Sequence, residues 1–107
     1  DLWQPDVLND ATTNVRVDAF DAIRWAPAGR TLAFMIAGSD GKGAARGFGH
    51  TSGPRCFGQD GMGGQIAFVD PESGLSVSYL TNGLDRHFLR QQRRRVSIAN
   101  KVAACIE

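Results

Sequence analysis

The sequence has no hydrophobic run long enough to cross a lipid bilayer. Its most apolar stretches, TLAFMIA at 31–37 and VAACI at 102–106, fall far short of the roughly 20 residues that a transmembrane helix needs. The opening residues, DLWQPD, show no charged region followed by an apolar one, so no secretory signal is visible. We expect a soluble chain without a membrane span, and its cellular compartment stays open.

Cysteine and excess charge are also scarce. The two cysteines, Cys56 and Cys105, are too few for a disulfide framework, and they could form one bridge or remain thiols. With 12 Lys and Arg against 11 Asp and Glu, the net charge of +1 gives no broad field to attract a polyanion. The arginine run at 93–95 has no interleaved aromatic residues for base stacking. We therefore interpret this run as a solvated helix face and expect no nucleic-acid partner.

Metal and nucleotide motifs are missing as well. His50 and His87, with Asp60 and the cysteines, supply ligand atoms but not the spacing of a structural zinc site. The segment GQDGMGG at 58–64 lacks the Lys and Ser or Thr that end a mononucleotide-binding loop, and a strand-like run follows it instead of a helix. We expect neither a metal nor a cofactor.

At 107 residues, the chain has room for a single domain. Pro5 near the start favours a short helix over residues 5–12. Residues 31–37 predict a strand, because every second side chain is bulky and apolar: Leu32, Phe34 and Ile36. Residues 38–64 hold ten of the 13 glycines, which predicts a loop region with short extended pieces around Phe48 and Phe57.

The second half of the sequence predicts a hairpin and a long helix. Two β-rich runs, IAFVD and LSVSYLT, flank the turn PESG and predict a hairpin over 65–82. Asp85 is the expected N-cap of a helix over 85–106. Its apolar stripe is predicted to be Leu89, Val96, Ala99, Ala103 and Ile106. The predicted fold class is α+β: an antiparallel sheet of about three strands with a C-terminal amphipathic helix packed on one face.

The stretch FGQDGMGGQIAFVDPESGLSVSYLTNGL, residues 57–84, resembles the C-terminal part of serine hydrolases of the β-lactamase and penicillin-binding-protein superfamily. It looks most like the class C-like esterases and the β-lactamase-related proteins. In that superfamily a strand carries Lys-Thr-Gly or His-x-Gly, and a glycine-rich bend, a D-P-E-x-G hairpin and a closing helix follow. The resemblance implies that Gln59, Asp60 and Gly61 occupy the triplet, with Gly63 and Gly64 in the bend. The chain would then be a C-terminal fragment of the β-lactamase-like α/β sandwich.

The triplet departs from the superfamily pattern at its first position. Gln59 is a neutral amide where relatives place Lys or His, so it can donate a hydrogen bond but cannot shift the pKa of a neighbour by charge. His50, in the near-duplicate FGHTSG, is an alternative for the motif histidine if the following residues are an insertion. Gln59 is preferred, because its spacing to the bend and the hairpin needs no gap.

The resemblance implies hydrolysis of an ester, amide or lactam through an acyl-serine, with residues 61–64 near the oxyanion hole, where missing Cβ atoms let a carbonyl approach. The superfamily's nucleophilic Ser, its Lys and its Tyr lie upstream of anything in this sequence. The string SDGK at 39–42 matches S-x-x-K, but its glycines argue against the helix that this motif requires. We expect this chain alone to be inactive and to act together with the missing N-terminal part of the domain.

The alternative interpretation is a non-catalytic module that serves binding or self-assembly. A few strands taken from a larger antiparallel sheet leave an unpaired edge, and such an edge tends to pair with another chain. This interpretation predicts a homodimer formed through the exposed sheet edge.

Overall fold

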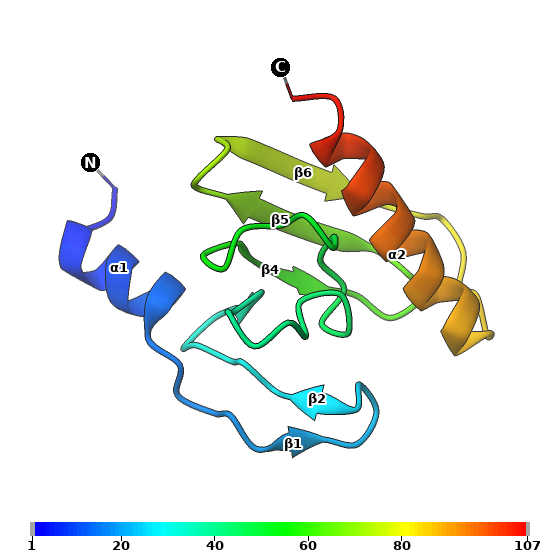
Figure 1. Cartoon of the computed structure of the whole chain (residues 1–107), viewed down its shortest axis with the longest axis horizontal. Helices are drawn as coiled ribbons and strands as arrows, with labels where there is room; N and C mark the ends of the chain where they lie inside the picture. Colours follow the sequence, from blue (N-terminus) through cyan, green and yellow to red (C-terminus); the bar gives the residue numbers. More distant parts are fainter. Residues whose placement is uncertain (1, 107) are drawn as a thin grey trace.

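The computed structural model of the chain describes residues 2–106, which form two helices and two antiparallel sheets (Figure 1). The larger sheet has four strands in the order β3-β4-β5-β6. Its strands are β3 (Met35–Ile36), β4 (Phe57–Asp60), β5 (Ile66–Asp70) and β6 (Leu75–Tyr79). The C-terminal helix α2 (Phe88–Ala103) lies across one face of this sheet, which confirms the predicted α+β class.

The two faces of the large sheet have different surroundings. On the face toward α2, Phe68 of β5 pairs with Val77 of β6 and belongs to the hydrophobic core, which also includes Ala99 of α2. The core consists of Met35, Ala37, Phe48, Cys56, Ile66, Phe68 and Ala99. On the opposite face, the paired residues Gln59 and Ala67 are exposed, so this face of the sheet is open.

The β5–β6 hairpin follows directly from its turn sequence. Residues 71–74 connect the two strands, and Gly74 has φ +73°, a left-handed conformation that glycine adopts without steric cost. The strands then pair in register from Ile66 opposite Tyr79 to Asp70 opposite Leu75. Successive side chains of IAFVD and LSVSY therefore point alternately to the covered face and to the open face of the sheet.

The first predicted strand is shorter than expected. Over 31–37, the pairing with β4 involves Met35 and Ile36 only. The reason is a local turn: the Thr31 N–H donates to the Phe34 carbonyl at 2.8 Å, and the Thr31 hydroxyl donates to the same oxygen at 3.1 Å. Leu32 consequently lies in this turn with 71% of its surface exposed instead of on the face of a strand.

Strand β4 is the short extended piece expected near Phe57, inside the region otherwise predicted as loop. Gly58 is buried in this strand because β5 approaches it closely: a Cβ added there would lie 2.6 Å from the Cβ of Phe68. The glycine thus marks close strand packing and not a break in the sheet.

Helix α2 differs from its prediction in both its start and its buried face. It begins at Phe88 with His87 as N-cap, whose ring Nδ1 accepts a hydrogen bond from the Arg90 N–H at 3.3 Å, so the prediction of Asp85 as N-cap is wrong. The predicted apolar stripe is correct for Ala99, which is buried in the core, and wrong for Leu89 and Ile106, which are exposed. The residues of α2 that are buried are Gln91, Arg95 and Ala99.

The N-terminal third consists of α1 (Pro5–Thr13) and a small sheet of β1 (Phe20–Asp21) and β2 (Ala26–Pro27). The turn between β1 and β2 holds Trp25 at φ +53°, with its ring edge-on to Phe20 at 5.9 Å between centroids. Neither helix within residues 2–106 is long and apolar enough to span a membrane.

Arg46 joins the small sheet to the large one from inside the glycine-rich region. Its side chain is buried and donates to the backbone carbonyls of Pro27 at 2.9 Å and Ala37 at 2.7 Å. It also donates to the carboxylate of Asp40 at 2.9 Å, and this hydrogen bond lowers the pKa of Asp40 to about 2. A buried arginine thus supplies the order that regular strands do not provide between 38 and 56.

The contact at Gly58 predicts a large loss of stability for Gly58→Ala. The added Cβ forces β4 away from β5, so we expect the free energy of unfolding to fall by about 3 kcal/mol in urea denaturation. Gly83→Ala is the matched control, because nothing lies within 4 Å of a Cβ there, and it is expected to change little. Equal effects of the two substitutions would contradict this account of β4.

Candidate active site

A pocket of about 610 Å³ opens where β4 ends and α2 begins. Its floor includes Gln59, Asp60 and Gly61, at the end of β4 and the start of the following bend. Its walls come from the β1–β2 turn at 23–24 and from residues 84–86, which precede α2. Three parts of the chain that are distant in sequence therefore meet at one hollow.

An ion cluster around Asp60 holds these parts together. The Arg24 Nη2 atom, from the β1–β2 turn, donates to Asp60 Oδ1 at 2.8 Å and to Oδ2 at 2.9 Å. Arg95 of α2 donates to Asp60 Oδ2 from the other side. The side chains are only 7% exposed for Asp60, 3% for Arg95 and 15% for Arg24. Asp60 thus fixes the turn, the strand and the helix to one another.

The two arginines differ in how the protein shifts their pKa values. Burial lowers the pKa of Arg95 despite the attraction of Asp60. Burial also acts on Arg24, but the charge of Asp60 and the hydrogen bonds to Asp60 and Asp21 outweigh it and raise its pKa. Two causes account for the difference: Asp21 is a second carboxylate 3.0 Å from Arg24, and the charge of Arg24 further lowers the pKa of Arg95. Both guanidiniums remain charged at neutral pH.

The ion cluster continues through α2 into the glycine-rich region. Arg95 Nη2 donates to Gln92 Oε1 at 2.6 Å, and Gln92 Nε2 in turn donates to the Ala45 carbonyl at 2.7 Å. The prediction that residues 93–95 form a solvated helix face is therefore wrong for Arg95. Arg95 is buried because it pairs with the buried carboxylate of Asp60. Arg24 and Arg95 were not among the residues predicted for the site. The sequence signal that could have indicated them was Asp60, because a carboxylate at the end of a core-facing strand needs a cationic partner when it is buried.

Gln59 and Asp60 point to opposite sides of the sheet, as neighbours in a strand do. Gln59 is exposed on the open face, and its Nε2 donates at 3.2 Å to the backbone carbonyl of Asp60. Of the triplet, Gln59 is therefore the side chain that a ligand can reach.

The bend after the triplet is tighter and more buried than the sequence pattern predicts. The Gly61 N–H donates to the Gln65 carbonyl at 2.9 Å and is thus already used within the bend. Gly63 and Gly64 are buried at φ +100° and +102°, and a Cβ at Gly64 would lie 3.7 Å from the Cβ of Gln91 in α2. Glycine is needed at 63 and 64 for backbone conformation and close packing. Of the three glycines proposed for the site, Gly61 alone lines the pocket.

His50 lies apart from the triplet. Its backbone N–H donates to Asn100 Oδ1 of α2 at 2.7 Å, and it borders a separate hollow along α2 with Gln92 and Lys101. Within residues 2–106, none of the pockets described contains both His50 and Gln59. The two alternatives for the motif position therefore belong to different surfaces.

The remaining candidate residues do not form a catalytic group. Ser39 and Lys42 lie in a bend, where the Lys42 N–H donates to Asp40 Oδ1 at 3.0 Å, so this S-x-x-K string has no helix. Cys56 and Cys105 are free thiols, and burial raises the pKa of Cys56 to about 12. Within residues 2–106, no three His, Cys, Asp or Glu side chains are grouped so that they could hold a metal ion.

The antiparallel sheet covered by a C-terminal helix is an α+β arrangement that fits a fragment of the β-lactamase-like fold. Residues 5–100 match the family model described as Beta-lactamase. Since this match covers most of the sequence, the chain belongs to the β-lactamase family. No curated protein and no solved structure shows a significant match to it.

The ion cluster predicts that Asp60→Asn strongly destabilises the fold. The substitution leaves two buried guanidiniums without their carboxylate, so we expect a loss of about 3 to 5 kcal/mol in the free energy of unfolding, measured in urea. Asp10→Asn is the control, because its pair with Arg16 is exposed, and little change is expected. If both variants unfold alike, the ion cluster does not hold the three segments.

Proposed function

We propose that this chain forms one wall of the active site of a β-lactamase-like serine hydrolase, which cleaves an ester, amide or lactam through an acyl-serine. The observation that carries the proposal is the position of Gln59. It is exposed at the pocket, on the strand where the resemblance places the Lys or His of the superfamily triplet. The family match over residues 5–100 supports the β-lactamase-like class of this proposal.

In this proposal Gln59 orients the substrate by hydrogen bonding. A serine Oγ attacks the carbonyl carbon, the leaving group departs with a proton, and water then splits the acyl-serine into acid and free enzyme. The Gln59 amide can donate to an oxygen of the substrate, but as a neutral group it cannot activate the nucleophile by charge. Its contribution is therefore binding and alignment.

The nucleophile and its base come, in this proposal, from a segment outside residues 2–106. Within these residues the only S-x-x-K string, at 39–42, lies in a bend where Gly41 has φ +71°. No helix places Ser39 and Lys42 on one face there, which the chemistry of this motif requires. The chain described here supplies the wall of the pocket and not the attacking group.

Acylation tests the proposal directly. The 107-residue chain is expected to keep its mass when it is incubated with p-nitrophenyl butyrate or a fluorescent penicillin, as read by intact mass spectrometry. In a longer product of the same gene that carries such a helix, Gln59→Ala should lower kcat/KM for the ester about five- to tenfold, through one lost hydrogen bond. Ser76→Ala, on the same open face, is the control. Acylation of Ser39 in the short chain would disprove this division of roles.

Self-assembly is the second candidate function, and one observation favours it. β6 is the terminal strand of the four-stranded sheet, and its sequence LSVSY has neither a charge nor a proline to protect the free edge. Antiparallel pairing of two β6 strands about Val77 would set Ser76 opposite Ser78 without opposing like charges.

Sedimentation velocity over a hundredfold range of concentration tests this pairing. A dimer is expected at high concentration, and Val77→Lys should abolish it by placing two like charges opposite each other at the centre of the contact. Ser73→Lys, in the exposed turn beside β6, is the control. A strict monomer at the highest concentration would argue against self-assembly.

A further inference from the structure

Four large apolar side chains stand exposed around the pocket at the end of β4. They are Ile23 at 68% exposure, Met62 at 85%, Leu84 at 60% and Phe88 at 43%. They come from the β1–β2 turn, the glycine bend, the segment before α2 and the first residue of α2. Exposed apolar groups that converge on a hollow from separate segments are typical of a ligand site.

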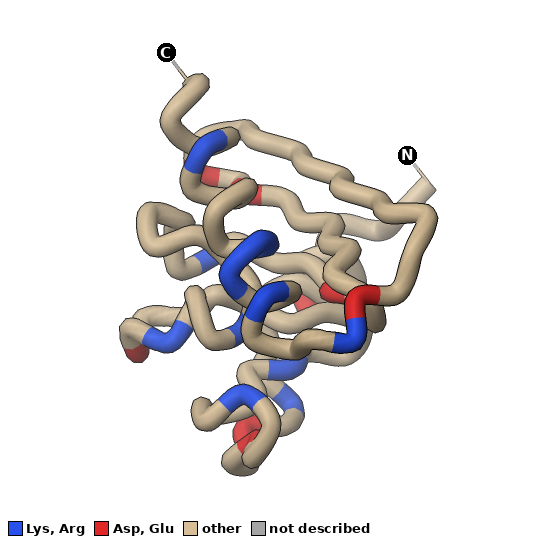
Figure 2. Tube along the Cα trace, turned by 90° about the vertical axis from the view of Figure 1, so that its right-hand side faces the viewer, with Lys and Arg blue, Asp and Glu red and all other residues tan. Residues whose placement is uncertain are grey.

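The charged groups of the pocket, in contrast, are already paired with one another. Asp60 binds Arg24 and Arg95, and Asp85 accepts hydrogen bonds from Arg90 at 2.8 Å and Arg94 at 2.7 Å. In Figure 2, basic positions are spaced along α2 with acidic positions beside its start. The pocket therefore offers little free charge to a ligand.

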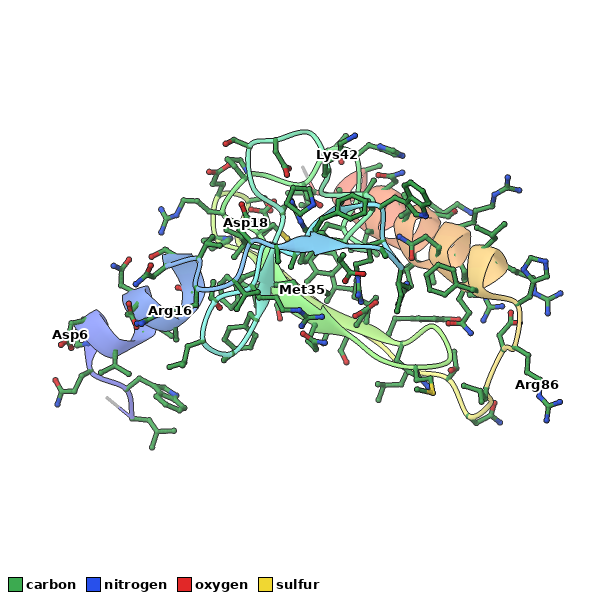
Figure 3. The ribbon with its side chains drawn as sticks, turned by 90° about the horizontal axis from the view of Figure 1, so that it is seen from below. Asp6, Arg16, Asp18, Met35, Lys42 and Arg86 are labelled. Carbon is green, nitrogen blue, oxygen red and sulfur yellow. The ribbon has the colours of Figure 1, made fainter. Side chains whose placement is uncertain are left out.

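Arg86 is the exception among the charged residues that line the pocket, since the described part of the chain gives it no ion pair. It extends away from the body of the molecule in Figure 3, so its charge is solvated at the outer edge. The Nε atoms of Arg24 and Arg95 also lack a partner among residues 2–106, but both are buried from solvent. That of Arg95 lies 3.8 Å from the position of a Gly47 Cβ, beside the glycine-rich region.

We propose that this pocket selects a neutral ester with an apolar acyl group and discriminates against anionic substrates, such as a lactam that bears a carboxylate. This inference rests on the proposed function and adds the substrate class. The apolar rim receives the acyl chain, and the neutral Gln59 amide donates to an ester oxygen. An anion at the inner end of the pocket would be desolvated where Arg24 and Arg95 are already paired with Asp60, which is costly. The unpaired Arg86 lies at the solvated outer edge, where pairing with an exposed charge contributes little. Hydrolysis converts the neutral ester into a carboxylate. Because the pocket discriminates against anions, this product is released readily.

Binding to the 107-residue chain tests the inference without requiring a nucleophile. Amide signals of the ¹⁵N-labelled chain are followed by NMR during titration with ethyl butyrate, butyrate or benzylpenicillin. We expect ethyl butyrate to shift the signals of Gly61, Met62 and Leu84, and the two anions to leave them unchanged at the same concentration. Equal or larger shifts with either anion, or no shift with ethyl butyrate, would overturn the inference.

Two exposed leucines provide a matched pair of variants. Leu84→Ser, at the rim, should weaken ethyl butyrate binding about five- to tenfold through the loss of apolar contact. Leu80→Ser, at a residue 75% exposed and outside this pocket, should leave binding unchanged. Equal affinity of the two variants would overturn the inference, as would concentration-dependent shifts of the rim signals without ligand, which would show that a second copy covers the rim.

The result can be separated from the test of the proposed function. If a longer product is acylated by penicillin while the short chain fails to prefer the ester, the proposed hydrolase stands and the substrate class is rejected. If the short chain binds ethyl butyrate but no longer product is ever acylated, the hydrolase is rejected instead.

Discussion

The carboxylate of Asp60 is the centre on which the arrangement of this chain depends. It meets Arg24 across 36 residues of sequence and Arg95 across 35, so it joins a turn, a strand and a helix that have no local reason to meet. Buried ion pairs often add little net stability, because desolvation offsets their attraction. Their loss is nevertheless costly, since an unpaired buried charge remains. We therefore assign this cluster the role of fixing one relative placement of the three segments.

The glycines of residues 38–64 serve separate local needs and not one shared function. Gly58 lets β5 approach β4, and Gly64 combines a positive φ with packing against α2. Gly53 lies where a Cβ would collide with the Glu72 carboxylate. A high glycine content therefore does not by itself indicate a loop or a ligand surface. What it indicates here is backbone that packs closely in several places, which includes a regular strand.

Local sequence predicted those parts of the fold that local forces determine. The β5–β6 hairpin follows from two β-rich runs and from a glycine at the left-handed turn position, and the existence of α2 follows from apolar residues at helical spacing. The buried face of α2 could not be read in the same way. Apolar periodicity favours Leu89 and Ile106, but the sheet side is occupied by Arg95, because a carboxylate 35 residues earlier requires it. Periodicity carries no information about such a distant partner.

The same ion cluster that holds the pocket together also determines the polarity of the pocket. Since neighbours in a strand face opposite ways, Asp60 turns toward the arginines while Gln59 turns toward the open face. The two buried cations beside Asp60 are thus already paired within the protein. An incoming carboxylate could bind Arg24 or Arg95 only by displacing Asp60, and that exchange would release the β1–β2 turn and α2 from β4. At the inner end of the pocket, affinity for an anion and integrity of the fold therefore oppose each other, and the unpaired Arg86 at the outer edge does not alter this. A neutral ligand places no demand on the cluster.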